Sequence, residues 1–106
     1  MFLFFYGSLM RGGENNHLLA GQRFIAEVTT DPFYRIIDLR HYTGLVPDET
    51  GGFAIHGELW SVDDKCLSEL DEFECEETAF ARRPIKITGH SGVEAYFWAG
   101  EGASTT

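Results

Sequence analysis

The chain has 106 residues, of which 43% are hydrophobic and 14% aromatic, and its formal net charge at pH 7 is −9. This length is typical of one domain and the apolar content is enough for a core, which excludes a disordered chain. The eight Lys and Arg residues form no long basic run. Binding to nucleic acid or to an anionic membrane surface is therefore disfavoured.

The first predicted element is a strand at Phe2–Phe5, because this apolar run is short and ends near a glycine, Gly7. The N–H groups of Ser8, Leu9 and Met10 can then point into a cavity beside the strand end and bind an anion or a carbonyl group. A Gly-Ser pair more often indicates an ordinary strand-to-loop turn, which is the alternative interpretation of these residues.

A short helix and two strands are predicted next. Residues 14–20 begin with helix-start side chains and predict a helix of about two turns. Alternating apolar residues predict a strand over Arg23–Thr29, which ends at Asp31-Pro32. Phe33–Leu39 predicts another strand, and the short connection favours antiparallel pairing, because a parallel crossover needs about a dozen residues or more.

His41–Gly52 predicts a long loop, either functional or a plain surface excursion. The next strand is predicted at Phe53–Val62, where Gly57 indicates a bulge or the close approach of another backbone. Asp63 is the expected N-cap of a helix. The apolar residues of that helix recur on one face at helical spacing, namely Cys66, Leu67, Leu70 and Phe73.

The last predicted elements are strands within Ala79–Thr88 and Val93–Ala99, which a tight connection joins into a β-hairpin. Pro84 is expected at the start of a strand or on a sheet edge, because proline cannot donate to the ladder. Residues 100–106 are small and polar and predict a flexible tail after a single domain at residues 1–99.

The predicted elements add up to about six strands and two helices, with most connections too short for parallel crossovers. The expected fold class is α+β: a small, mixed, strongly curved β-barrel with two short flanking helices. A curved sheet of this size leaves a cavity or cleft at one end.

The segment from residue 63 to residue 77 holds eight of the seventeen acidic residues, most of which are expected on a solvated face. Glu74 differs because it follows Phe73, where the helix leaves its apolar stripe, so its carboxylate can turn inward. Burial among aromatic rings would raise its pKa toward neutrality and suit it to acid–base catalysis. The residues alone do not firmly separate Glu74 from Glu72 and Glu76.

Other chemistries fit less well. Ser8 lacks the Gly-x-Ser-x-Gly context of a serine hydrolase, and the segment after Gly7 lacks the lysine of a phosphate loop. Cys66 and Cys75 have no zinc-site spacing and no histidine near them, so a zinc site is not expected. The chain start lacks a basic region and a long apolar run, which argues against a signal peptide and favours a cytoplasmic protein.

Five segments between Phe2 and about Trp98 carry a resemblance to a known family: Phe4–Leu9, Val46–Pro47, His56–Val62, Leu70–Glu74 and Phe80–Arg83. Each is weak by itself. In this order and spacing the chain resembles the γ-glutamylcyclotransferase-like superfamily, close in size to its γ-glutamylamine cyclotransferases and AIG2-like proteins.

The resemblance implies an enzyme whose cavity receives a γ-glutamyl amine or peptide, a small molecule, and releases 5-oxoproline and the free amine. It assigns substrate binding to Tyr6, Gly7, Ser8 and Leu9, and the acid–base role to Glu74. It implies no cofactor.

Three aromatic residues are further candidates to line the cavity: Tyr42, Phe80 and Tyr96. For the two tyrosines, simple packing is the alternative. Cys75 and Phe80 stand where the family commonly has glycine and tyrosine, and the loss of a hydroxyl would change how the substrate is oriented. A module that binds a small metabolite without catalysis is therefore the alternative function.

Overall fold

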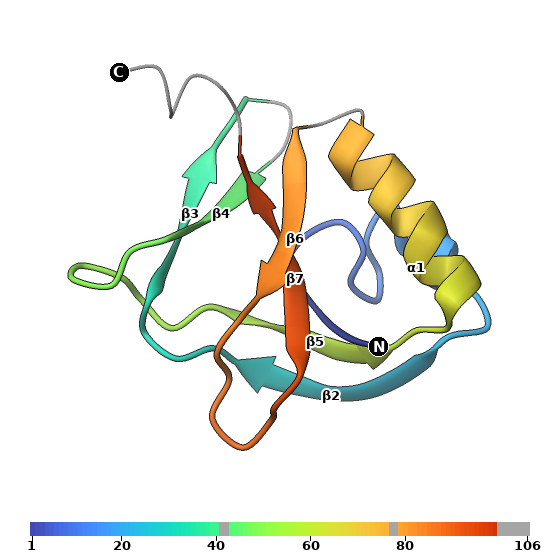
Figure 1. Cartoon of the computed structure of the whole chain (residues 1–106), viewed down its shortest axis with the longest axis horizontal. Coiled ribbons are helices and arrows are strands. Elements are labelled where there is room, and N and C mark those ends of the chain that lie inside the picture. Colours follow the sequence, from blue (N-terminus) through green and yellow to red (C-terminus); the bar gives the residue numbers. More distant parts are fainter. Residues whose placement is uncertain (41–42, 77–78, 100–106) are drawn as a thin grey trace.

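The computed structural model describes residues 1–40, 43–76 and 79–99 (Figure 1). The described elements follow the chain in this order: β1 (Phe2–Phe5), the 3-10 helix η1 (Asn16–Leu19), β2 (Arg23–Thr29), β3 (Tyr34–Asp38), β4 (Thr43–Pro47), β5 (His56–Ser61), α1 (Asp64–Asp71), the π-helix η2 (Glu72–Glu76), β6 (Phe80–Pro84) and β7 (Val93–Trp98). No helix among these residues is long and apolar enough to span a bilayer.

Five strands form the main sheet in the order β2-β5-β1-β7-β6. The sheet is mixed, because β1 runs antiparallel to β5 and parallel to β7. Strands β3 and β4 form a separate two-stranded sheet. Figure 1 shows this hairpin and α1 at opposite sides of the molecule, with the main sheet between them. The first strand of the chain is thus the central strand of the sheet.

The expected α+β class and mixed sheet are confirmed, but the predicted barrel is wrong. Among the described residues the main sheet stays open, with β2 and β6 as its edges. The strand at Arg23–Thr29 pairs with β5, whereas the next strand pairs with β4, so the strands do not form one continuous ladder. The expected antiparallel pairing between those two strands is therefore also wrong.

Two further predictions need correction, and both concern short elements. The predicted helix at residues 14–20 is only the 3-10 turn η1, which leaves α1 as the one α-helix of the described chain. The predicted loop at His41–Gly52 contains β4, because its Gly44 and Leu45 are buried against the rest of the fold. The expected tail at 100–106 lies outside the described residues.

The C-terminal hairpin and the helix cap are confirmed. Strands β6 and β7 pair antiparallel, and Pro84 ends β6 on the edge of the sheet. The Asp63 side chain caps α1 by accepting a hydrogen bond from the N–H of Cys66 at 2.8 Å. This cap satisfies one of the donors that every helix start leaves without a partner.

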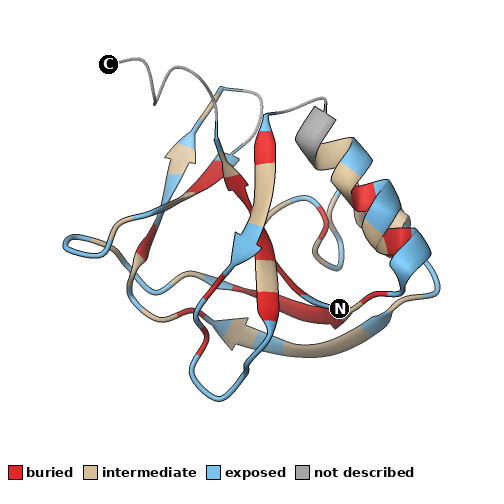
Figure 2. Ribbon diagram, viewed as in Figure 1, coloured by how far each residue is buried: buried red, intermediate tan, exposed pale blue. Residues whose placement is uncertain are grey.

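The core has two parts, one on each face of β1. Figure 2 shows buried residues in red along the strands and on α1. Leu3 and Phe5 pack on one side with the buried face of α1, which includes Leu70. Phe4 packs on the other side with Leu45. Leu3 and Phe4 are both fully buried, which confirms the predicted strand with two covered faces. Burial of this kind stabilises by about 2 kcal/mol per large side chain.

Gly57 marks a close approach between β5 and β1. A Cβ atom at this position would lie 2.2 Å from the Phe5 carbonyl oxygen and 2.6 Å from the ring of Phe4. On its other edge β5 pairs with β2, and the register shift of that pair lies in β2, between Phe24 and Ala26. The prediction that another backbone lies close to Gly57 is therefore confirmed. The alternative, a bulge at Gly57, is wrong, because the register shift lies in β2.

Candidate active site

A cavity of about 410 Å³ opens where the end of β1 faces η2 and the C-terminal hairpin. It brings together seven of the residues singled out in the sequence: Tyr6, Gly7, Ser8, Leu9, Glu74, Phe80 and Tyr96. Tyr42, also singled out, lies outside the described residues. No group of three or more potential metal-ligating side chains occurs in the parts of the chain that the structure describes.

The loop after β1 satisfies its own carbonyl groups. The carbonyl oxygen of Gly7 accepts from the N–H of Met10 at 3.1 Å, and that of Ser8 from the N–H of Asn15 at 2.9 Å. The carbonyl oxygen of Leu9 accepts from the Asn16 side chain, also at 2.9 Å. Asn15 also donates its side-chain amide to the Ser8 hydroxyl. These bonds hold the turn rigidly, and none of them uses the N–H group of Ser8 or Leu9.

The N–H groups of Ser8 and Leu9 are therefore the donors that this turn can offer. Within residues 1–40, 43–76 and 79–99, neither N–H donates to a protein acceptor. Met10 was expected to contribute a third donor, but its N–H is used inside the turn. Two adjacent N–H groups at the wall of a cavity can bind a carboxylate or a developing oxyanion.

Glu74 lies on η2 and is partly buried at the same cavity. Burial raises the pKa of Glu74 from its ordinary 4.5 to about 7. Tyr6 shares the cavity, and burial, followed by the charge of Glu74, raises the pKa of Tyr6 as well. At neutral pH the site thus combines a carboxyl group close to its midpoint with a phenol that keeps its proton.

A network at the end of α1 determines where η2 begins. Asp71, the last residue of α1, accepts hydrogen bonds from Arg82 Nε at 2.9 Å and from the Tyr96 hydroxyl at 2.7 Å. Arg82 also contacts Glu94, in the neighbouring strand. Although burial acts in the opposite direction, the Arg82 and Tyr96 hydrogen bonds lower the pKa of Asp71.

This network has a geometric consequence for Glu74. Asp71 is fixed to β6 through Arg82 and to β7 through Tyr96, and Glu74 follows three residues later in a π-helical turn. The turn therefore starts from a fixed point beside two of the strands that wall the cavity. Arg82 contacts Asp71 through Nε at 2.9 Å and through Nη2 at 3.0 Å, and such a bidentate contact is geometrically specific because the guanidinium group is planar.

Six other lining residues were not proposed for the cavity from the sequence: Phe4, Phe5, Glu14, Asn15, Thr43 and Phe73. Thr43 belongs to β4, inside the segment predicted as loop, so no strand pattern pointed to it. Phe73 was assigned to the apolar face of the helix. Asn15 was expected only as a helix-start residue, and no signal in the sequence connects it with Ser8.

The two cysteines lie in different helices, Cys66 in α1 and Cys75 in η2. Cys66 is buried in α1, and its thiol donates to the Leu18 carbonyl oxygen across 3.6 Å. Cys75 lies in η2, directly after Glu74, and its side chain lies outside the described part of the structure. Phe80, the other departure from the family pattern, is buried and lines the cavity, so the wall at this point is apolar.

Comparison with known proteins gives one consistent family. The family model described as "Gamma-glutamyl cyclotransferase, AIG2-like" matches residues 3–105. The chain is 33% identical over 86 residues to the Gamma-glutamylcyclotransferase family protein YtfP of Escherichia coli K12, covering 81% of this chain and 73% of that protein. It is 34% identical over 102 residues to Gamma-glutamylaminecyclotransferase C of Danio rerio, covering 85% and 67% of the two chains.

A solved structure has a closely similar fold. The crystal structure of c4763, a uropathogenic E. coli-specific protein, superposes with a TM-score of 0.79 at 28% sequence identity. The superposition covers 92% of this chain and 77% of that one. This chain therefore shares the fold of that protein.

Proposed function

Because this chain belongs to the gamma-glutamyl cyclotransferase, AIG2-like, family of enzymes, we propose that it cyclises the γ-glutamyl group of an amine or peptide. The products are 5-oxoproline and the free amine, and Glu74 is the acid–base group. The observation that carries this proposal is the position of Glu74. It lies in one cavity with the Gly7–Leu9 turn, and its pKa is about 7.

The proposed reaction needs one proton acceptor and no protein nucleophile. The Glu74 carboxylate takes a proton from the α-ammonium group of the substrate, and the freed nitrogen attacks the γ-carbonyl carbon of the same molecule. Glu74 then returns the proton to the leaving nitrogen as the old C–N bond breaks. The ring nitrogen gives up its second proton as the five-membered lactam forms, and this proton passes through Glu74 to the released amine or to solvent. The protein has to hold the folded conformer, since ring closure is already unimolecular.

The pKa of Glu74 suits this proton transfer. An α-amino group titrates near pH 8, so transfer to a carboxylate with a pKa of about 7 is uphill by only about 1.4 kcal/mol. For a glutamate with the ordinary pKa of 4.5, the same proton transfer would be uphill by about 5 kcal/mol. A catalyst titrating near the working pH also returns the proton readily, as the second half of the reaction requires.

The remaining cavity residues have supporting roles in this proposal. The N–H groups of Ser8 and Leu9 bind the substrate carboxylate or the oxyanion that develops on the γ-carbonyl, and one good donor of this kind contributes about 3 kcal/mol. Tyr6 keeps its proton and donates from its hydroxyl. Phe80 and Tyr96 form the wall against which the γ-glutamyl chain folds.

Release of 5-oxoproline from a substrate panel tests the proposed function. The panel contains γ-glutamyl amino acids, γ-glutamyl amines and γ-glutamyl-ε-lysine, each incubated with the wild type and with Glu74→Gln. We expect release from at least one member by the wild type, and the best substrate identifies the leaving amine. Folded protein that releases nothing from any member would contradict the proposal. The alternative of a cavity that only binds has no support among the relatives.

The pH dependence of kcat/KM is expected to follow Glu74. Because the carboxylate form accepts the proton, kcat/KM should rise about tenfold per pH unit and level off above about pH 7. Initial rates of 5-oxoproline release between pH 5 and 9 give this profile. Glu72→Gln, which changes an exposed carboxylate of the same turn, should leave the inflection in place. A profile that is already flat at pH 5, as an ordinary glutamate would give, would remove Glu74 from the role of base.

Gly7→Ala is expected to impair substrate binding without affecting folding. A Cβ at Gly7 would approach only the Thr43 hydroxyl, at 3.9 Å, so the added methyl group would stand between two residues of the cavity wall. We expect KM to rise about tenfold, roughly 1.4 kcal/mol of lost affinity, with the thermal midpoint nearly unchanged.

Gly13→Ala is the matched comparison for Gly7→Ala. A Cβ at Gly13 would lie 2.2 Å from the Ser8 carbonyl oxygen, so this change should lower the thermal midpoint. Equal stability losses in the two variants, or an unchanged KM for Gly7→Ala, would contradict the proposed position of the substrate.

A further inference from the structure

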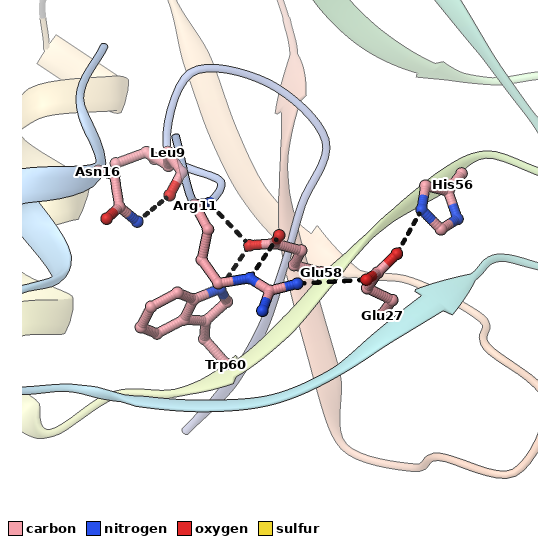
Figure 3. A network of polar contacts seen from close by, with 7 residues as sticks. All are labelled: Leu9, Arg11, Asn16, Glu27, His56, Glu58 and Trp60. Atoms are coloured by element: carbon pink, nitrogen blue, oxygen red, sulfur yellow. Dashed lines mark hydrogen bonds and ion pairs between the residues drawn. The ribbon is translucent and has the colours of Figure 1, made fainter. Parts of the chain in front are cut away.

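Glu58 is a buried carboxylate that the proposed reaction does not use. It lies in β5 opposite Phe5, the last residue of β1, and only 6% of its surface is exposed. Its carboxylate accepts three hydrogen bonds, from the Arg11 N–H at 3.0 Å, from Arg11 Nε at 3.0 Å and from the Trp60 indole at 3.1 Å (Figure 3). Burial opposes ionisation, but these donors together lower the pKa of Glu58.

Arg11, in contrast to Glu58, is only partly buried. About half of its side chain is exposed, at 48%. Three contacts fix its position: Glu58, the carboxylate of Glu27 at 3.3 Å, and the ring of Phe24, whose centroid lies 3.7 Å from the guanidinium carbon. Figure 3 shows the arginine between the two carboxylates, with His56 on the outer side of Glu27. Glu58 is the one buried partner in this set.

These contacts close the loop that carries the substrate-binding turn. The chain leaves the sheet at Phe5, opposite Glu58, and six residues later Arg11 is bound to Glu58 through both its main chain and its side chain. The segment between these two points contains Gly7, Ser8 and Leu9. Both ends of the turn are therefore attached to one position of β5.

We propose that Glu58 is a positioning residue, which through Arg11 holds the N–H groups of Ser8 and Leu9 in place at the cavity. The catalytic part of this inference rests on the proposed function. A buried ion pair stabilises a fold little compared with apolar packing, so its main consequence here is the geometry it imposes. A donor displaced by about 1 Å loses much of its interaction with the substrate.

Glu58→Gln tests this role with little change of shape. Glutamine keeps one acceptor oxygen but turns an NH₂ group toward donors of Arg11 or Trp60, so the tether weakens. We expect the ¹H–¹⁵N resonances of Ser8 and Leu9 to shift. The Met10 and Asn15 amides, whose hydrogen bonds close the turn, should exchange about tenfold faster. For the best γ-glutamyl substrate we expect KM to rise about tenfold, with kcat within threefold and the pH inflection unchanged.

Glu27→Gln is the matched control. It removes the other carboxylate that contacts Arg11, but this carboxylate is 60% exposed, and exposed ion pairs contribute little. It should leave the Ser8 and Leu9 resonances and KM unchanged. Arg11→Met provides a second test should Glu58→Gln fold poorly. Its apolar stem keeps the contact with Phe24, and it should reproduce the resonance shifts and the rise in KM.

The possible outcomes separate this role from the proposed function. Wild-type resonances for Ser8 and Leu9 in both Glu58→Gln and Arg11→Met would overturn the tether. Shifted resonances with an unchanged KM, or a loss in kcat in place of KM, would overturn its link to substrate binding. If the wild type releases no 5-oxoproline, the proposed function fails, and the amide comparison still decides whether Glu58 holds the turn.

Discussion

Glu74→Gln is expected to lower kcat for 5-oxoproline release by about 10³-fold, within the range that general acid–base groups usually contribute. Glutamine has nearly the same shape as glutamate but cannot accept the proton of the α-ammonium group or pass one to the leaving nitrogen. Substrate binding by the Ser8 and Leu9 N–H groups does not need the carboxylate, so KM should change little. Initial rates at saturating substrate measure the effect.

Two controls make this loss specific to the position of Glu74. Glu72→Gln removes an exposed carboxylate from the same π-helical turn and should keep wild-type rates. Circular dichroism and the thermal midpoint report whether the Glu74 variant is folded. A folded Glu74→Gln protein that retains more than about a tenth of the wild-type rate would exclude Glu74 as the acid–base group.

The same substitution is expected to stabilise the protein at alkaline pH. Burial raises the pKa of Glu74 to about 7, so the native state binds this proton more tightly than the unfolded chain does. The stability that the proton provides is present below the unfolded value of 4.5 and is lost as pH rises through about 7. A neutral glutamine avoids this loss.

The predicted size of this effect follows from the pKa difference. Between pH 5 and pH 8, Glu74→Gln should gain about 2–3 kcal/mol of unfolding free energy relative to the wild type. Urea titrations of both proteins at the two pH values measure it. Because the comparison is between variant and wild type, the titration of other groups cancels. A difference that does not change with pH would mean that Glu74 is solvated in the folded protein.

Elements with strong local signals could be predicted from the sequence. Phe2–Phe5 is apolar on both faces and proved to be the centre of the sheet, and the Asp63 cap fixed the start of α1. The hairpin of β6 and β7 was also predictable, because its two strands are close in sequence and a glycine-containing turn joins them.

The pairing of distant strands could not be predicted. Strand β2 pairs with β5, about thirty residues further along the chain, and not with its sequence neighbour β3. Local pattern carries no information on such a choice, which packing between remote side chains decides. The barrel was wrong for the same reason, since it assumed that neighbouring strands in sequence are neighbours in the sheet.

Only part of the candidate site could be predicted from the sequence. Sequence position alone could not separate Glu74 from Glu72 and Glu76 as the candidate acid–base residue. Which carboxylate of an acidic run is buried depends on how the turn is anchored. The anchor is the contact of Asp71 with Arg82 and Tyr96, eleven and twenty-five residues away. Glu58 gave no signal as a tether, since its partner Arg11 lies forty-seven residues before it.

Because β3 and β4 form a separate hairpin, protein engineering can vary their part of the cavity wall independently of the rest. Thr43, in β4, faces a cavity whose reacting groups all stand on other elements. The hairpin abuts the main sheet closely at Gly44, where a Cβ would lie 2.8 Å from that of Trp98. Libraries randomised at Thr43 with Gly44 kept constant would therefore vary the shape of the cavity wall, while the groups proposed for ring closure stay in place. Such libraries offer a starting point for redirecting this scaffold to chosen γ-glutamyl compounds.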